Sequence, residues 1–201
     1  MPRSFSDQEK VEIRARLIAK AIDSMERYGV RKSNVEWIAK ATGISKGGFY
    51  LFYSAKEELL FDAFLSVQSN VRADLLSGLK KQSSGADEVR FFLEFLFLSF
   101  EKYPVLTVLA RSEELAALMR GIDPRRQKAE SRADDLFFQE IYSDWKRRQI
   151  VDGQKAARMA GLPGMALALT LEKELIGTRR FKDTKSLLIN GLVRELTDDG
   201  S

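Results

Sequence analysis

The stretch SNVEWIAKATGISKGGFYLFYSAKEELL, residues 33–60, decides the fold of this 201-residue chain. Its apolar spacing predicts one short helix to about Thr42 and a second from a cap at Ser45 to about Tyr53. Gly43 suits the turn between them, because glycine adopts a positive φ without steric cost. Two short helices joined in this way form a helix-turn-helix, whose second helix is shaped to enter the major groove of DNA.

The segments on either side are also predicted to be helical. Apolar residues recur at steps of four and three from Val11 to Met25, which predicts a helix over about 7–28 that Gly29 ends. Ser54 caps a long helix toward Lys80. Further helices are expected over about 87–103, 105–119, 124–148, 152–177 and 183–196. The chain is therefore expected to be all-α with about nine helices, divided into a helix-turn-helix domain at 1–54 and a helical domain at 55–201.

The composition narrows the classes of function. The chain has no cysteine and no histidine, which excludes a Ser-His-Asp triad and argues against a zinc site. The net charge is +4, so any contact with nucleic acid must be local. No signal peptide and no apolar run of the roughly 20 residues that span a membrane are visible. We expect a cytoplasmic protein that is not an enzyme and needs no cofactor or metal.

Ile38-Ala39, the segment 41–47, Phe49-Tyr50 and the segment 53–60 fall at a spacing that resembles a known signature. It is the N-terminal motif of the tetracycline-repressor (TetR) family of bacterial transcription regulators, roughly I-A-x-x-A-G-V-S-x-G-x-L-Y-x-x-F-x-x-K-E-x-L. The resemblance covers about the first 60 residues. Phe49 replaces the leucine of the motif, and Tyr53 replaces its phenylalanine.

The resemblance implies that the second short helix and its neighbours lie at a DNA surface. The candidate DNA-binding residues are Ser33, Asn34, Ser45, Lys46, Gly47, Gly48, Phe49, Tyr50, Tyr53 and Lys56. In such an interface, phosphate contacts supply much of the affinity and base edges supply the specificity.

The chemistry of these residues agrees with that implication but leaves alternatives open. Glycine costs about 1 kcal/mol in a helix interior, so Gly47 and Gly48 either allow the backbone to approach DNA closely or form a loose turn. Lys46 either contacts a phosphate or a guanine edge or is simply solvated. Tyr50 either offers its hydroxyl to a phosphate or only packs. Lys56 opens a helix, where the dipole disfavours a cation and a bound phosphate would offset that cost.

Other candidates also carry two interpretations. Ser33 and Asn34 either cap the first short helix or donate to a phosphate. Phe49 or Leu51 can meet a thymine methyl group, and Leu51 points outward if Phe49 and Phe52 point inward. The ring of Tyr53 lies either in the core or at its edge.

The C-terminal domain carries clustered aromatic residues at helical spacing, a pattern that usually forms a core. Regulators of the family generally hold an apolar effector pocket among these helices, and aromatic walls suit such a pocket. The predicted lining is Phe97, Tyr103, Leu106, Phe137, Phe138, Ile141, Tyr142, Trp145 and Met165. The last two helices are expected to form a homodimer seam, through Leu167, Leu171, Leu175, Leu188 and Leu192.

The resemblance and the residues together predict a ligand-responsive DNA-binding regulator. The expected form is a repressor that a small apolar or amphipathic effector releases from a palindromic operator. Two-fold symmetry would set the helix-turn-helix domains of the two subunits roughly 34–36 Å apart. The alternative is a helical ligand-binding or interaction protein without sequence-specific DNA binding.

Overall fold

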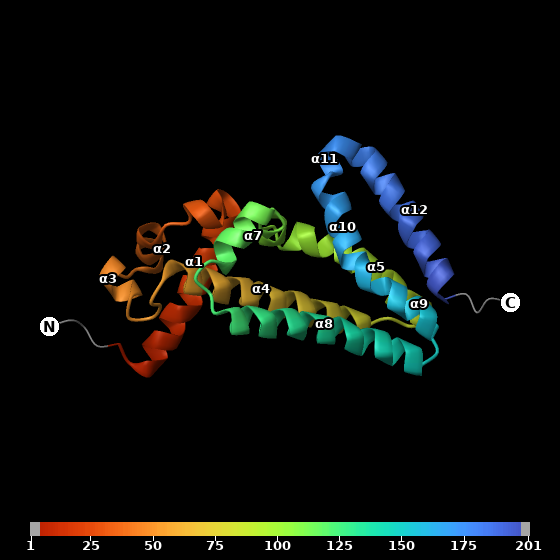
Figure 1. Ribbon diagram of the computed structural model, residues 1–201, viewed down its shortest axis with the longest axis horizontal. Coiled ribbons are helices and arrows are strands. Elements are labelled where there is room, and N and C mark those ends of the chain that lie inside the picture. Colours follow the sequence, from red (N-terminus) through yellow and green to blue (C-terminus); the bar gives the residue numbers. More distant parts are fainter. Residues whose placement is uncertain (1–4, 198–201) are drawn as a thin grey trace. The chain divides into compact units, whose positions relative to one another are not determined.

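The computed structural model describes residues 5–197, and no strand occurs in that range. The helices are α1 (Asp7–Lys32), α2 (Val35–Thr42), α3 (Lys46–Phe49), α4 (Lys56–Leu79), α5 (Gly85–Lys102), α6 (Val105–Leu109), α7 (Ser112–Met119), α8 (Pro124–Arg147), α9 (Gly153–Arg158), α10 (Leu162–Leu171), α11 (Lys173–Ile176) and α12 (Thr178–Thr197), with a 3-10 helix, η1, at Met159–Gly161 (Figure 1). The predicted all-α class is confirmed. None of these helices is both long and apolar enough to cross a membrane.

The helices form two compact units. The first contains the chain up to residue 70 together with 104–127, and the second contains 71–103 and 128 onward. Helices α4 and α8 therefore contribute residues to both units. The predicted boundary between residues 54 and 55 does not coincide with the limits of these compact units, and the division into two functional domains stays a prediction.

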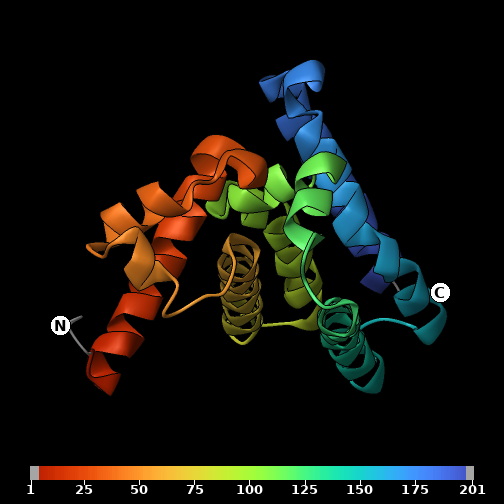
Figure 2. The ribbon, with the colours of Figure 1, turned by 60° about the vertical axis from the view of Figure 1, so that its left-hand side comes forward.

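The core of the first unit forms where α1 packs against α2, α6 and α7. Leu17, Ala21 and Met25 from α1 are completely buried, together with Ile38 from α2 and Phe49 from α3. Figure 2 shows these N-terminal helices, coloured red to orange, from a second direction. This apolar support holds the two short helices in place.

Gly29 and Gly43 interrupt the helices at the positions that the sequence predicts. Gly29 has φ 76 and ψ 171 and separates the main part of α1 from one further turn that ends at Lys32. Gly43 has φ 83 and ψ 22 and caps α2 in the left-handed conformation. Both values lie in a region that favours glycine, so these two residues set the corners of the helix-turn-helix.

Helix α3 is shorter than predicted, because it ends at Phe49 rather than near Tyr53. The chain continues in 3-10-type turns, with Leu51 N donating to Gly48 O at 3.2 Å and Phe52 N to Phe49 O at 2.9 Å. Two consecutive glycines weaken a helix, which fits so short a regular segment.

The core of the second unit is aromatic, as predicted. The Phe92 ring makes edge contacts with the rings of Phe138, Tyr142 and Trp145, at centroid distances of 6.2, 5.9 and 5.4 Å. Helix α5, which carries Phe92, also packs against α10 and α12. Edge-to-face geometry suits the quadrupoles of aromatic rings, so this cluster stabilises the unit beyond its apolar burial.

Two predicted helices are divided in the structure, and the total therefore exceeds nine. The segment 105–119 splits into α6 and α7 because Arg111 is extended, with φ −75 and ψ 122. The segment 152–177 splits into α9, η1, α10 and α11. Pro163 lies in the first turn of α10, the place where a missing N–H costs least. The Gly161–Gly164 stretch thus breaks its helix rather than kinking it.

Candidate functional site

Polar caps fix the start of each short helix in the helix-turn-helix. Asn34 Oδ1 accepts from Glu36 N at 2.7 Å and Trp37 N at 3.4 Å, so it caps α2. Ser45 Oγ accepts from Gly48 N at 3.0 Å and caps α3. Capping therefore accounts for Asn34 within the chain. A phosphate contact by the exposed Asn34 stays a prediction.

Ser33 lies inside the first unit. Its hydroxyl donates to Gly29 O at 2.8 Å and accepts from Ser24 Oγ at 3.0 Å. The residue is 4% exposed. Its polar atoms therefore have partners within the chain, between α1 and α2, and a contact of Ser33 with DNA stays a prediction.

The outer surface of α3 and the turn after it is exposed. Ser45, Lys46, Gly47, Tyr50 and Leu51 are all open to solvent. Tyr50 is 52% exposed and Leu51 is 70% exposed. The prediction that Leu51 points outward is confirmed. We name these five residues and the half-buried Gly48 the α3 surface.

Phe49 and Tyr53 belong to the core and not to the α3 surface. Phe49 is 0% exposed and Tyr53 is 5% exposed. Their rings stack at a centroid distance of 6.0 Å, and the Arg14 guanidinium lies 5.5 Å from the centroid of Tyr53. Burial raises the pKa of the Tyr53 phenol. The Tyr53 ring is thus a core group, and a contact of either side chain with DNA stays a prediction.

The glycines of the α3 surface are not required by contacts within the chain. A Cβ at Gly47 would meet only Ser45 Oγ, at 3.9 Å. A Cβ at Gly48 would lie 3.3 Å from Ser45 Oγ and 3.5 Å from Ile44 Cβ. Neither glycine has a positive φ. Folding of this unit therefore gives no reason for glycine at Gly47, and close approach of an external molecule remains the physical explanation we favour.

Lys56 has partners inside the chain. Its Nζ donates to Val30 O at 3.3 Å and Arg31 O at 3.5 Å, and lies 3.9 Å from Glu57 Oε1. These oxygens offset the unfavourable helix dipole at the start of α4. Contacts within the chain are thus sufficient to explain a lysine at the start of α4. A phosphate contact by Lys56 stays a prediction.

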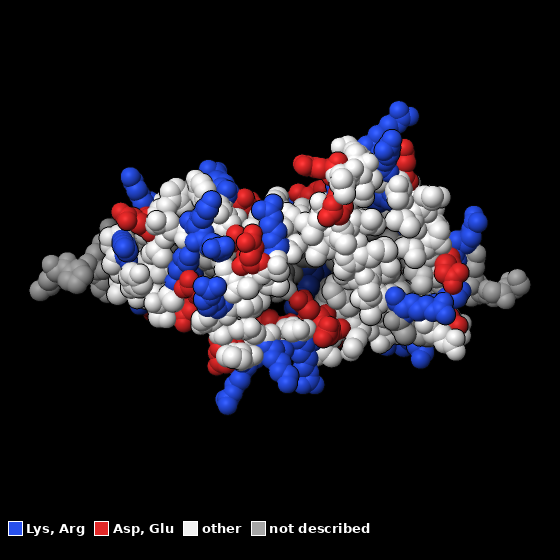
Figure 3. Space-filling model, turned by 45° about the horizontal axis from the view of Figure 1, so that its top comes forward, with Lys and Arg blue, Asp and Glu red and all other residues white. Residues whose placement is uncertain are grey.

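Charge is mixed on the face of the molecule that Figure 3 draws. On that face, lysine and arginine side chains are interspersed with aspartate and glutamate and form no continuous basic belt. This distribution fits a net charge of only +4. Contact with DNA must then depend on the local shape and chemistry of the α3 surface.

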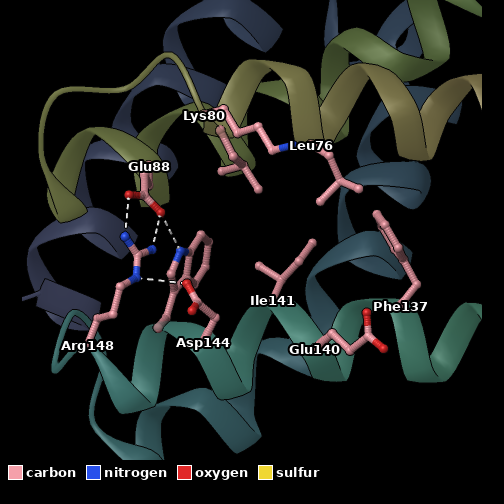
Figure 4. Close-up of a pocket in the computed structure, with 10 residues that line it drawn as sticks. Leu76, Lys80, Glu88, Phe137, Glu140, Ile141, Asp144 and Arg148 are labelled. Carbon is pink, nitrogen blue, oxygen red and sulfur yellow. Dashed lines mark hydrogen bonds and ion pairs between the residues drawn. The ribbon is translucent and has the colours of Figure 1, made fainter.

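The second unit contains a cavity of about 420 Å³ between the end of α4, the start of α5 and α8 (Figure 4). Its wall is formed by Leu76, Leu79, Lys80, Glu88, Phe137, Glu140, Ile141, Asp144, Trp145 and Arg148. The volume lies in the range of small-molecule sites. We name this cavity the α4–α8 cavity.

The α4–α8 cavity contains part of the predicted effector pocket. Phe137, Ile141 and Trp145 line it, and their role in effector binding stays a prediction. The other predicted residues lie elsewhere. Phe97, Phe138, Tyr142 and Met165 pack in or against the core of the same unit, the Tyr103 hydroxyl donates to Asp74 at 2.5 Å, and Leu106 belongs to the first unit. The aromatic pattern located the wall on α8 but did not separate cavity residues from core residues.

An ion cluster that the sequence analysis did not identify closes one end of the cavity. The Arg148 guanidinium donates to both Glu88 oxygens, at 2.8 and 2.5 Å, and its Nε lies 2.7 Å from Asp144 Oδ2. Trp145 Nε1 donates to Glu88 Oε2 at 2.9 Å. The hydrogen bonds from Arg148 hold the pKa of the Glu88 carboxyl below its usual range. The exposed Lys80 and Glu140 are the other charged groups of the wall (Figure 4).

An apolar surface lies along α10, α11 and α12. Leu171, Leu175 and Leu187 are 43%, 84% and 74% exposed. Of the predicted dimer residues, Leu171 and Leu175 are therefore exposed. Leu167 and Leu188 are half-buried, and Leu192 packs partly against the core of its own unit. Leu187 was not predicted.

Small residues of η1 and α10 extend this surface. Gly161 of η1 and Gly164 and Ala168 of α10 are exposed. Gly164, Ala168 and Leu171 recur at steps of four and three, which keeps them on one side of α10. We name these four residues together with Leu175 and Leu187 the α10–α12 surface.

Comparisons with known proteins agree with this geometry. Residues 17–63 match the family model described as bacterial regulatory proteins, tetR family. No curated protein sequence gives a match. Among solved structures, the fatty acid degradation regulator FadR from Bacillus halodurans is similar over 98% of both chains, with 14% identity and a TM-score of 0.64.

Two further solved structures have the same fold. A TetR transcriptional regulator from Chloroflexus aurantiacus J-10-FL is 18% identical, with a TM-score of 0.69, over 93% of this chain and 97% of that one. FadR from Bacillus subtilis, in complex with stearoyl-CoA, is 17% identical, with a TM-score of 0.65, over 92% and 97%. At these identities, the similarity shows the fold of both units.

Proposed function

We propose that this chain, whose helix-turn-helix belongs to the tetR family of bacterial regulatory proteins, is a DNA-binding regulator of transcription that responds to a small ligand. The observation that carries the proposal is the α3 surface: Lys46 on α3 and Tyr50 and Leu51 on the turn after it are exposed, whereas Phe49 between them is buried in the apolar core. A rigid, capped support is what a reading helix needs in order to hold its side chains at base edges.

Four residues of the α3 surface have a chemical role in this proposal. Lys46 supplies a cation for a phosphate or a guanine edge, and the Tyr50 hydroxyl donates to a phosphate. Gly47 lets the backbone approach the DNA strand. The exposed aliphatic group of Leu51 suits a thymine methyl group, and Leu51 is the residue that would add base preference.

The active form in this proposal is a homodimer joined through the α10–α12 surface. Leu175 and Leu187 are the most exposed leucines of the described chain, at 84% and 74%. Exposed apolar side chains that gather on a surface are typical of a protein interface. A two-fold axis would direct two α3 surfaces at half-sites one helical turn apart, roughly 34–36 Å, and would require a near-palindromic operator.

The α4–α8 cavity is the proposed effector site. Apolar and aromatic side chains line it together with Lys80, Glu140 and the Glu88–Arg148–Asp144 cluster, and this mixed lining suits an amphipathic molecule. The Bacillus subtilis relative was solved with stearoyl-CoA, so long-chain acyl-CoA is the first class of molecule to test. An effector releases a repressor from DNA only if it binds the non-binding conformation more tightly.

The experiment that tests the proposal is selection of bound sequences from random duplex DNA by the purified chain at low salt. The expected result is enrichment of one near-palindromic sequence with half-site centres about 10 base pairs apart. A selection that ends with no sequence enriched, using protein that is folded by circular dichroism, would overturn it.

A further inference from the structure

The connection between α1 and α2 is held by side chains from two other helices. Gly29 turns the chain with φ 76 and ψ 171, and α2 begins at Val35 after its cap. Val30 and Arg31 follow the turn, and Val30 is only 1% exposed. We name residues 29–31 the α1–α2 connection.

Glu114 of α7 binds the N–H groups of this connection. Its Oε2 accepts from Val30 N at 2.6 Å and from Arg31 N at 3.2 Å. A Cβ at Gly29 would lie 2.9 Å from Glu114 Oε1 and 3.0 Å from Glu114 Cδ. Glycine at position 29 is therefore needed twice, for its positive φ and for the space that the carboxylate occupies.

Lys56 of α4 binds the carbonyl groups of the same connection. Its Nζ lies 3.3 Å from Val30 O and 3.5 Å from Arg31 O. The two peptide units are thus held at their donors by an anion and at their acceptors by a cation. Hydrogen bonds to charged groups are stronger than those between neutral groups, so both contacts oppose movement of the segment.

The position of the connection determines where the reading helices begin. Ser33 Oγ donates to Gly29 O at 2.8 Å, and Asn34 then caps α2, which leads through Gly43 to α3. A displacement at Val30 would therefore move the α3 surface with it. Glu114 touches none of the residues that we assign to that surface, so its influence on DNA must be indirect.

Helix α7 is itself fixed to the start of α8. Gln127 Nε2 donates to Met119 O at 3.0 Å and to Ile122 O at 2.8 Å. Further along, α8 lines the α4–α8 cavity with Phe137, Ile141 and other residues. Helix α4, which binds the connection through Lys56, itself continues to Leu76 in the cavity wall.

We propose that Glu114 is a positioning residue for DNA recognition: by binding the backbone of Val30 and Arg31, it holds α2 and α3 in the orientation that fits an operator. The inference rests on the proposed function, since it assumes that α3 reads DNA. Loss of the carboxylate weakens operator binding without removing any group that contacts DNA.

The first measurement needs no DNA. Amide hydrogen exchange at Val30 and Arg31 is followed by NMR in the wild-type chain, Glu114→Ala, Glu114→Gln and Glu113→Ala. Glu113 is the matched control, because it is the neighbouring carboxylate, pairs with Arg31 at 3.5 Å and has a side chain that is 66% exposed. We expect exchange at both amides to increase at least about tenfold in Glu114→Ala, the equivalent of about 1.4 kcal/mol.

The second measurement compares affinity for the selected operator with affinity for a scrambled duplex. Glu114→Ala is expected to lower the ratio of specific to non-specific affinity about tenfold, while the salt slope of non-specific binding is unchanged. Glu113→Ala removes the same charge and should leave the ratio unchanged. Glu114→Gln retains an acceptor oxygen and should restore most of the ratio, which a simple loss of stability or of charge would not produce.

The outcomes separate this inference from the proposed function. Val30 and Arg31 amides that exchange freely in the wild-type chain, or equal specificity ratios for Glu114→Ala and Glu113→Ala, overturn the positioning role. If the wild-type chain protects these amides but its selection enriches no DNA sequence, the contact between Glu114 and the backbone stands. That result overturns the proposed function.

Discussion

At the scale of single residues, Gly29 carries more constraint than any other glycine on the path to the reading helices. Its φ of 76 and ψ of 171 lie in a region that is essentially restricted to glycine. The Glu114 carboxylate occupies the place of a Cβ as well. Gly47, in contrast, has open space beside it and helical geometry.

This contrast gives a matched pair of substitutions. Gly29→Ala should lower the free energy of unfolding by about 1–3 kcal/mol, from backbone strain and displacement of Glu114. Gly47→Ala should leave it unchanged or raise it by up to about 1 kcal/mol, because alanine is the better helix former. Thermal unfolding of the two variants checks both. Equal melting temperatures for Gly29→Ala and wild type would show that the connection does not require glycine.

Lys56 has two alternative roles that one variant separates. If it contacts a phosphate, Lys56→Ala weakens binding evenly across sequences and reduces the salt slope by about 1. Titrations of one duplex at several salt concentrations measure this slope. An unchanged slope together with a lower melting temperature would assign Lys56 to the carbonyl contacts at Val30 and Arg31 alone.

Glu88 gives a pH-dependent prediction. Its side chain is 14% exposed, and hydrogen bonds from Arg148 hold its pKa below the usual value. A lowered pKa in the folded state contributes stability above the pKa of the unfolded state, and this contribution is lost as pH falls through the folded value. Glu88→Gln should therefore lower the free energy of unfolding at pH 7 by about 1–3 kcal/mol. Its melting temperature should be below that of the wild-type chain.

The difference between Glu88→Gln and wild type should shrink as the pH falls from about 4.3, the ordinary value for glutamate, toward acid. Thermal melts across pH 3–7 follow it. A difference that stays constant over that interval would show that the charge of Glu88 contributes nothing to the stability of the cluster.

At the scale of helices, local rules predicted most of the elements. Gly29 and Gly43 end helices because of their backbone freedom, and Ser45 caps α3 through its own hydroxyl. Pro163, inside the helix predicted over 152–177, instead lies in the first turn of α10, where proline is tolerated. Each of these signals acts within a few residues of its effect, so the sequence alone carries it.

The break at Arg111 has no comparable local signal. Neither glycine nor proline lies beside it, yet its backbone is extended and α7 begins after it. The contacts of α7 are distant in sequence: Glu114 and Val30 are 84 positions apart. Such a break depends on tertiary contacts that a pattern of apolar residues cannot contain.

In the candidate sites too, some features follow from local sequence and others depend on contacts that are distant in sequence. Exposure of Leu51 and burial of Phe49 follow from helical spacing, whereas the core position of Tyr53 also depends on Arg14 from α1. In the cavity wall, Arg148 reaches Glu88 across 60 positions. The spacing of Asp144 and Arg148 was a usable signal for one ion pair, but nothing local indicated their partner on α5.

At the scale of the whole molecule, the proposal requires two copies of the chain. Leu175→Glu combined with Leu187→Glu places carboxylates on the α10–α12 surface and should give a monomer by sedimentation at micromolar concentration. Operator affinity should then fall at least about a hundredfold, because one reading head replaces two. Leu136→Glu, at a leucine of α8 that is 47% exposed, is the control and should keep the wild-type mass. A double variant with unchanged mass would remove the α10–α12 surface from the model.

The central claim is that the α3 surface reads DNA, and the most direct measurement is the affinity of Leu51→Glu for the selected operator. Leu51 is 70% exposed, so the substitution should leave the melting temperature close to that of wild type while adding a carboxylate where DNA is expected. We predict a loss of at least about a hundredfold, equivalent to about 2.7 kcal/mol of like-charge repulsion and lost apolar contact. Leu136→Glu should bind within about twofold of wild type. Equal affinities for Leu51→Glu, Leu136→Glu and the wild-type chain would contradict the account.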